Sequence, residues 1–282
     1  MLVFIISILS YTFIPAIASL IYVAVDGNPA TYIDVETDQF IFIPPVQENF
    51  IFHISLILVL AIIWLSVKFI LKRPLRTLIT RENKIDWKKI FWSFKVFSIL
   101  FLISIFIGYI ISPEDVSLYK FKWIDYVFVF FITLFLTPIQ TTLEELMFRG
   151  ILLQWIGKII KNPFLLAFII GGIFGGLHFA NPEMNSSAFW VGLDYVFVGF
   201  MLTYISAKTG NLEFSIAAHA ANNMWIYWLI TMDDSIGEGL PALFYVNSSN
   251  PAPSTILNIL LFICFYYVIY KKYLKEKSSM KK

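Results

Sequence analysis

Charged residues and cysteine are scarce in this sequence, and each scarcity excludes a class of protein. Only 14% of the 282 residues are charged, against about a quarter in soluble domains, which argues against an ordinary soluble domain. Hydrophobic residues make up 59% of the chain, which places it in the membrane class. The single cysteine, Cys264, excludes an intrachain disulfide and a cysteine-based metal cage.

The N-terminal segment also lacks the basic region of a cleavable signal peptide. Its first residues, Met1 to Ile5, are apolar apart from the terminus, and the apolar run continues to about Val25. That run is too long for the core of a signal peptide, so we expect a retained helix.

Long apolar runs predict the fold class. A helix needs about 20 mostly apolar residues to cross a bilayer. We therefore expect an all-α fold, a polytopic membrane helical bundle of about eight transmembrane helices. No internal repeat divides the chain, so residues 1–282 are expected to form a single transmembrane domain in a lipid bilayer, with no nucleic-acid partner. The runs lie near residues 2–25, 49–71, 90–112, 124–147, 163–181, 187–207, 212–232 and 254–271.

The basic residues predict an orientation, because positive charge favours cytoplasmic loops. With eight spans, nearly all basic loop residues fall on one side, which is then cytoplasmic and holds both termini. Lys120 and Lys122 are exceptions that fit the headgroup layer before the fourth span. The residues on the cytoplasmic side are Lys72, Arg73, Arg76, Arg81, Lys84, Lys88, Lys89, Lys158, Lys161, Lys208, Lys271, Lys272, Lys275, Lys277, Lys281 and Lys282. The acidic loop residues opposite them are Asp26, Asp34, Glu36, Asp38, Glu48, Asp233, Asp234 and Glu238.

Glu144, Glu145 and Arg149 stand at the end of the apolar run that begins near Ile124. An ionisable group in hydrocarbon costs at least a few kcal/mol. On a helix, side chains four apart are separated by about 40° and side chains five apart by about 140°. Arg149 should therefore share a face with Glu145 and form an ion pair with it, bidentate if the geometry permits. Glu144 is left free to meet other helices, which suits a general base acting on water. The simpler alternative is that all three snorkel to the cytoplasmic interface.

Two histidines lie inside later apolar runs. His178 follows two overlapping glycine pairs, at 171/175 and 172/176, which permit another helix to approach closely. His219 is flanked by alanines, and Asn223 lies one turn beyond it on the same face, whereas Asn222 is displaced by about 60°. Together with Glu144 these histidines indicate a shared site. The same residue types would serve a proton relay in a transporter, so these arguments leave hydrolysis and transport open.

Three motifs in this region resemble those of the CPBP family of intramembrane proteases. They are Glu144-Glu145-x-x-x-Arg149, Phe174-x-x-x-His178 and His219-x-x-x-Asn223, in the family's order and at plausible spacing. The family includes the CAAX-prenyl endopeptidases of the Ras-converting type and the bacterial Abi proteins of bacteriocin maturation and self-immunity. The similarity covers about residues 124–230, including the turn at 208–212 before the His219 helix.

The resemblance implies an intramembrane endopeptidase that cleaves a membrane-protein or peptide substrate. It assigns activation of the attacking water to Glu144 and His178, support to Glu145 and Arg149, and oxyanion stabilisation to His219 and Asn223. Glu144, His178 and His219 also form a two-histidine, one-carboxylate set that suits a catalytic zinc. No His-Glu-x-x-His segment is present, and by a small margin we favour a glutamate-dependent site without a tightly held zinc.

Two other functions compete with proteolysis. A non-proteolytic membrane scaffold, or a bacteriocin self-immunity protein of the same fold, would keep its cellular effect without Glu144. A proton-coupled transporter is less favoured because the sequence shows no inverted repeats. CAAX prenylation is a eukaryotic signal, whereas a compact chain rich in Ile, Phe and Lys is typical of AT-rich Gram-positive bacteria, so we expect a multi-pass protein of a bacterial cell membrane.

Overall fold

Apolar helices make up most of the structure, a computed structural model that describes residues 1–27, 32–34, 39–41, 43–247 and 250–275. Six of the described helical segments are long and apolar enough to cross a membrane, so the predicted all-α membrane bundle is confirmed. They are α1 (Leu2–Asp26), α2 (Pro45–Phe69), α4 (Trp87–Ile111), a continuous segment Trp123–Ile156 that begins with α5, α8 (Met184–Thr209), and α10 with its extension (Ala252–Leu274).

Two of the eight expected spans are shorter than the others. α7 (Pro163–Gly176) has 14 residues and α9 (Glu213–Leu229) has 17. At 1.5 Å per residue α7 is about 21 Å long, less than the roughly 30 Å of a bilayer's hydrocarbon core. The predicted span 163–181 therefore overestimates this helix, and the count of eight is approximate.

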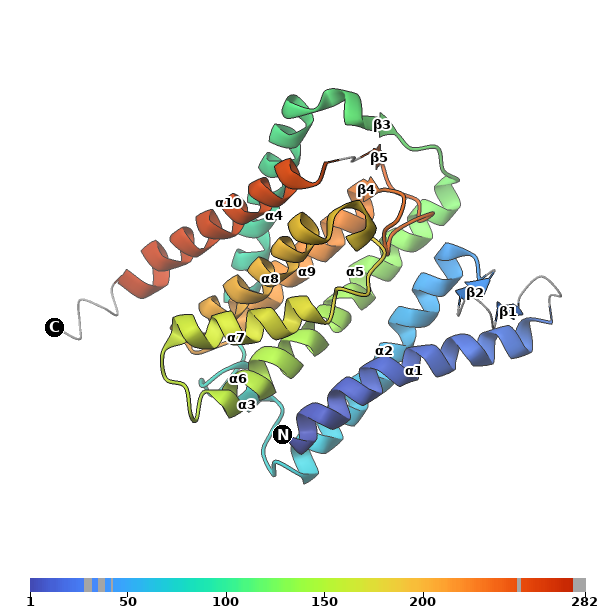
Figure 1. Ribbon diagram of the computed structural model, residues 1–282. Helices are drawn as coiled ribbons and strands as arrows, with labels where there is room; N and C mark the ends of the chain where they lie inside the picture. The colour runs from blue at the N-terminus through green and yellow to red at the C-terminus, as the bar shows by residue number, and fades with distance from the viewer. Residues whose placement is uncertain (28–31, 35–38, 42, 248–249, 276–282) are drawn as a thin grey trace.

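The helices form a bundle in which α5 (Trp123–Glu145) and α9 lie centrally (Figure 1). α2 packs on α5, and α1 packs on α2 at one edge of the bundle. On the other side α4 packs on α9, α10 (Ala252–Ile269) packs on both α4 and α8, and α7 packs on α8. His53 links α2 to α5, because its Nε2 lies 3.1 Å from the Thr137 hydroxyl. α5 and α9 are antiparallel, because successive α9 residues contact α5 in reverse order: His219 bonds to Glu145, Asn223 to Gln140 and Trp228 to Thr133.

A π-helical segment interrupts the long helix directly after the glutamate pair. α5 ends at Glu145, the π-helix η2 spans Leu146–Leu152, and α6 (Leu153–Ile156) completes the segment. All seven π-helical residues are buried. Such segments are rare and occur often at functional sites.

Short strands and turns lie at one end of the bundle, opposite the start of α1 and the end of α10 (Figure 1). The antiparallel hairpin β1–β2 joins α1 to α2, and a three-stranded sheet has the order β3-β5-β4. In that sheet β3 is antiparallel and β4 is parallel to β5. The strands are β1 (Tyr32–Asp34), β2 (Gln39–Ile41), β3 (Val116–Leu118, after the 3-10 turn Pro113–Asp115), β4 (Ile230–Thr231) and β5 (Phe244–Val246).

The opposite end of the bundle carries most of the basic loop residues. It includes α3 (Arg76–Ile79), the turns at 157–162 and 208–212, and the π-helical extension of α10, Tyr270–Leu274. Asp86 accepts the Lys89 backbone N–H at the start of α4, which lowers the pKa of its carboxyl. Five charged residues used to predict the orientation lie outside the described residues: Glu36, Asp38, Lys277, Lys281 and Lys282.

The turn at 208–212 sets the position of α9. Gly210 ends α8 with a φ of 77°, a left-handed conformation that favours glycine. The Leu212 N–H then donates to the Ile79 carbonyl at 2.7 Å. The buried Glu213 carboxylate accepts the Asp86 N–H at 2.7 Å and lies 3.4 Å from the Lys89 ammonium. These contacts fix the first turn of α9 against α3 and α4.

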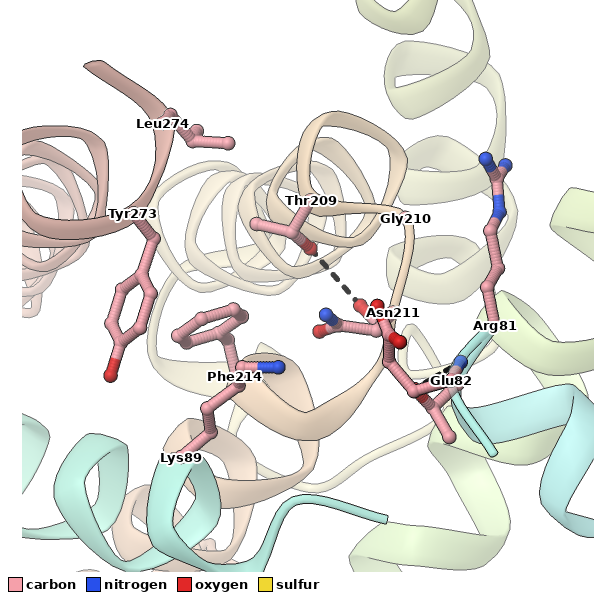
Figure 2. Close-up of a pocket in the computed structure, with 10 residues that line it drawn as sticks. Arg81, Glu82, Lys89, Thr209, Gly210, Asn211, Phe214, Tyr273 and Leu274 are labelled. Carbon is pink, nitrogen blue, oxygen red and sulfur yellow. Dashed lines mark hydrogen bonds between the residues drawn. The ribbon is translucent and has the colours of Figure 1, made fainter. Parts of the chain in front are cut away.

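A cavity of about 350 Å³ lies beside this turn (Figure 2). Thr209 donates to the Asn211 carbonyl at its wall. None of the residues predicted to form the catalytic site lines this cavity. Its lining residues are Thr80, Arg81, Glu82, Lys89, Thr209, Gly210, Asn211, Phe214, Tyr273 and Leu274.

Candidate active site

Arg149 and Glu145 form the ion pair that helical phase predicts, and both side chains are fully buried. Arg149 Nη1 lies 3.0 Å from Glu145 Oε1. The pair is not bidentate, because the rest of the guanidinium binds α8. Its Nε donates to Thr203 Oγ1 at 3.1 Å and its Nη2 donates to the Gly199 carbonyl at 2.9 Å. Arg149 thus anchors η2 to α8 while neutralising Glu145, and snorkelling to the interface is excluded for this pair.

His219 lies in the second turn of α9, and its ring faces both glutamates. Nδ1 is 2.9 Å from Glu145 Oε1, a hydrogen-bond distance. Nε2 is 3.6 Å from Glu144 Oε2, which is too long for a hydrogen bond. Because Glu145 is paired with Arg149 as a carboxylate, Nδ1 carries the hydrogen and donates it. That bond fixes the ring and directs Nε2 toward Glu144.

The Glu144 side chain faces other helices and not Arg149, as helical phase predicts. Its Oε1 accepts a hydrogen bond from the Tyr11 hydroxyl of α1 at 2.6 Å and another from Gln140 Nε2 at 2.5 Å. Its Oε2 accepts no hydrogen bond in the described part of the chain and faces His219. The Glu144 carboxylate therefore lies where α1, α5 and α9 meet.

Asn223 joins this network through Gln140. Asn223 Nδ2 donates to Gln140 Oε1 at 3.3 Å, one turn of α9 beyond His219. Asn222, the weaker candidate by helical phase, donates to Asn223 Oδ1 at 3.2 Å and makes no hydrogen bond to the glutamates among the described residues. The amides of Gln140 and Asn223 thus extend the polar site from Glu144 toward the strand end of the bundle.

His178 follows the last turn of α7, and the length of that helix brings it near the site. The chain continues 11 residues past Glu145 before α6 ends, and α7 returns over a similar number of residues to Phe174. The Phe174 ring accordingly packs under the Arg149 guanidinium at 4.6 Å, and lies 6.1 Å from the His219 ring and 4.6 Å from the His178 ring. The similar residue counts before and after the turn at 157–162 therefore bring the C-terminal end of α7 back beside Arg149 and His219.

The His178 imidazole is held by its own helix and by α8. Nδ1 lies 2.7 Å from the Phe174 carbonyl, which can only accept, so Nδ1 carries the hydrogen and Nε2 keeps a lone pair. The ring stacks on Tyr195 with centroids 4.4 Å apart. Tyr195 in turn donates to Glu183. No hydrogen bond or ion pair joins His178 to Glu144 within the described residues.

The glycine pairs before His178 have different surroundings. A Cβ on Gly171 would lie 2.5 Å from the Phe200 nitrogen, and one on Gly175 would lie 2.7 Å from the Val196 nitrogen, so these two glycines permit the contact with α8. Gly172 and Gly176 have nothing within 4 Å of that position. Only one of the two predicted pairs is a packing contact here.

Several residues of the site are not predicted by the sequence motifs. Tyr11, Thr203 and Tyr195 come from α1 and α8 and meet the predicted residues only in space. Gln140 precedes Glu144 by four residues, a spacing that places both on one helix face. For Tyr11 the available sequence signal is its spacing of four residues from Ser7, which places the two polar side chains on one face of the helix.

The three residues suggested as zinc ligands do not form a ligand set in this structure. Glu144 Oε1 is hydrogen-bonded to Tyr11 and Gln140, and His219 Nδ1 is bonded to Glu145. Among the described residues no hydrogen bond or ion pair joins His178 to Glu144 or His219. In the part of the chain that the structure describes, no group of three His, Cys, Asp or Glu side chains is arranged to hold a metal ion. The residues as the structure places them therefore do not fit a zinc site.

Comparison with known proteins agrees with the motifs. Residues 123–225, which contain all six predicted site residues, match a family described as type II CAAX prenyl endopeptidase Rce1-like. An uncharacterized Bacillus subtilis protein, YyaK, is 39% identical over 252 residues, covering 89% of this chain and 84% of its own. No solved structure matches the chain significantly. The matched stretch coincides with the predicted core at 124–230, and this chain belongs to the CPBP family.

Proposed function

We propose that this protein is an intramembrane endopeptidase that hydrolyses a peptide bond of a membrane-associated protein or peptide precursor. One observation carries the proposal. Glu144 has one carboxylate oxygen held by two hydrogen bonds and a second oxygen that faces His219 without a bond to it. A carboxylate with a free oxygen, held between apolar helices, is suited to take a proton from water.

The proposed reaction needs only water and the substrate. Glu144 Oε2 takes a proton as the water oxygen attacks the carbonyl carbon and forms the new C–O bond. The lone pair on His178 Nε2 is available to orient the same water once substrate and water occupy the site. The C–N bond then breaks, the proton passes from Glu144 to the leaving nitrogen, and the carboxylate is regenerated.

His219 and Asn223 are proposed to stabilise the oxyanion that forms on the carbonyl oxygen. Both lie on the α9 face that meets α5, and the Nδ1 bond to Glu145 directs His219 Nε2 into the site. In the imidazolium form, whose second proton comes from solvent before the substrate binds, His219 donates its Nε2 hydrogen to the oxyanion, and the Glu145 carboxylate balances the positive charge. Preorganised donors of this kind are worth about 10²–10³ in rate. Glu145 and Arg149 act by holding His219 in place.

We propose that the protein lies in a bacterial cell membrane, and the charge distribution supports an orientation with the basic end of the bundle in the cytoplasm. Replacing Cys264 with Ser yields a cysteine-free chain, to which Lys84→Cys or Ile236→Cys can be added singly. A maleimide that does not cross membranes should label Ile236→Cys in intact cells. It should label Lys84→Cys only after permeabilisation. The reverse pattern would overturn this orientation.

Comparative proteomics of a Glu144→Gln strain tests the enzymatic function. We expect an uncleaved membrane-associated precursor to accumulate, and purified wild-type protein to cleave it. The matched control is Glu114→Gln, which makes the same change at an exposed position in the turn before β3. If Glu144→Gln fully complements the cellular phenotype and cleaves the precursor normally, the alternative of a non-proteolytic scaffold or self-immunity protein replaces the proposal.

A further inference from the structure

α1 contributes a side chain to the site although it lies outside the residues that match the family. Val3, Ser7 and Pro15 are the buried residues of α1, and Tyr11 completes their spacing of four residues. This row faces the bundle, while large apolar residues such as Leu9 and Phe13 are exposed on the other faces. Tyr11 is the residue of this row that reaches Glu144.

The hydrogen bonds at Glu144 distinguish its two oxygens. A carboxylate oxygen has two lone pairs, and Oε1 uses both to accept from Tyr11 and Gln140. Oε2 keeps both lone pairs and faces Nε2 of His219 at 3.6 Å. Gln140 lies on the same helix as Glu144, so Tyr11 supplies the donor that comes from another helix and fixes the carboxylate from across the site.

We propose that Tyr11 is a positioning residue, which holds Glu144 Oε1 so that Oε2 is the oxygen that takes the proton from the attacking water. This inference rests on the proposed function for the role of the proton, but the hydrogen bond itself can be tested without a substrate. The geometry supports a specific role for the hydroxyl. The Tyr11 ring already packs edge-on against Phe52 at 6.3 Å, and a phenylalanine would make the same contact. The hydroxyl adds only the bond to Glu144 and a longer one from Gln140.

Tyr11→Phe is therefore the variant of choice, and dicyclohexylcarbodiimide is the probe. This hydrophobic reagent adds to protonated carboxyl groups and leaves an N-acylurea that mass spectrometry locates. Hydrogen bonds to a carboxylate favour its charged, unreactive form. Losing one such bond should raise the labelling rate of Glu144 about tenfold at a fixed pH. A phenylalanine keeps the ring contact with Phe52, so the access of the reagent to Glu144 stays the same.

Tyr22→Phe is the matched control, because it removes the same hydroxyl from the same helix 11 residues further along. It should leave Glu144 labelling unchanged, and Glu144→Gln defines the background. With the precursor identified by proteomics, Tyr11→Phe should lower kcat about tenfold and leave KM near wild type, because a bond to the base alone is lost.

Two results would overturn the proposal. One is a Tyr11→Phe labelling curve that coincides with the curves of wild type and Tyr22→Phe. The other is altered labelling with an unchanged kcat, which would leave the bond without a positioning role. If wild-type protein cleaves nothing, the proposed function fails, and the labelling curves still decide whether Tyr11 holds Glu144.

Discussion

Glu144 and Glu145 are neighbours in the chain but lie in two different environments. Glu145 is fully buried, paired with Arg149 and bonded to His219, so its charge is neutralised within the bundle. Glu144 meets only neutral donors on Oε1 and an imidazole beyond hydrogen-bond distance on Oε2. One residue of helical phase separates a carboxylate that stabilises the bundle from one that is available for chemistry. The difference predicts that changes at the two positions have different consequences.

Arg149→Met should have the largest effect, because it leaves Glu145 charged, buried and without its cation. Breaking a buried ion pair in this way costs about 3–5 kcal/mol. We expect little folded protein, measured by thermal unfolding and size-exclusion chromatography in detergent. The double variant Glu145→Gln/Arg149→Met removes both charges and should regain much of the lost stability. If the single and double variants are equally stable, Glu145 does not depend on Arg149 as described.

Glu144→Gln should show the opposite pattern. Glutamine preserves the shape of the side chain, and its amide oxygen can still accept from Tyr11 and Gln140, so thermal stability should remain close to wild type. Cleavage should fall by about 10²–10⁴, the contribution of a general base. The measurement is cleavage of the accumulated precursor alongside an unfolding curve of the same preparation. A variant that loses stability but keeps its rate per folded molecule would contradict this assignment.

Asn223→Ala tests the proposed oxyanion donor on α9 and should lower cleavage somewhat less than Glu144→Gln. Loss of one oxyanion donor lowers kcat by about 10²–10³. Asn222→Ala should stay near wild type, because among the described residues the Asn222 side chain hydrogen-bonds to Asn223 and not to Glu144, Glu145 or His219. The two variants differ by one position on α9, so helix propensity and expression are matched. Equal losses of kcat in the two variants would show that Asn222 and Asn223 support the structure of α9 and that Asn223 has no separate role in the reaction.

These contrasts also show which features the sequence predicts. Helical phase is a local property, so the Glu145–Arg149 pair, the separate position of Glu144 and the shared face of His219 and Asn223 follow from spacing alone. The contact of Tyr11 with Glu144 spans 133 residues, and no periodicity within one helix encodes which distant helix packs beside it. Apolar runs likewise predict where helices are but not all of their ends.

The length of α7 illustrates that limit. Residues 177–180 are mostly apolar and continue the run, yet the helix ends at Gly176. The turn signal is the Asn181–Pro182 dipeptide a few residues later, and it is weaker evidence than the hydrophobic run before it. The end of α7 matters because His178 lies in the turn that follows the helix, not inside a full span, and there its Nδ1 bonds to the Phe174 carbonyl. A missed helix end of a few residues thus changes the predicted backbone setting of a catalytic candidate.

The smallest effect is expected from substitutions of two glycines of α7. Like Glu144 and Glu145, Gly172 and Gly175 are close in the chain but lie in different environments. Gly175→Ala would place its Cβ 2.4 Å from a Val196 methyl carbon and 2.7 Å from the Val196 nitrogen, so α7 must move away from α8. Overpacking of this kind costs about 1–3 kcal/mol. Gly172→Ala meets open space and should be neutral or slightly stabilising, because alanine favours helix by about 1 kcal/mol over glycine. Thermal unfolding of the two variants measures the difference, and it should carry over to cleavage, since α7 brings His178 to the site. If Gly172→Ala destabilises as much as Gly175→Ala, α7 is packed on both faces, and His178 is held by a contact other than the one with α8.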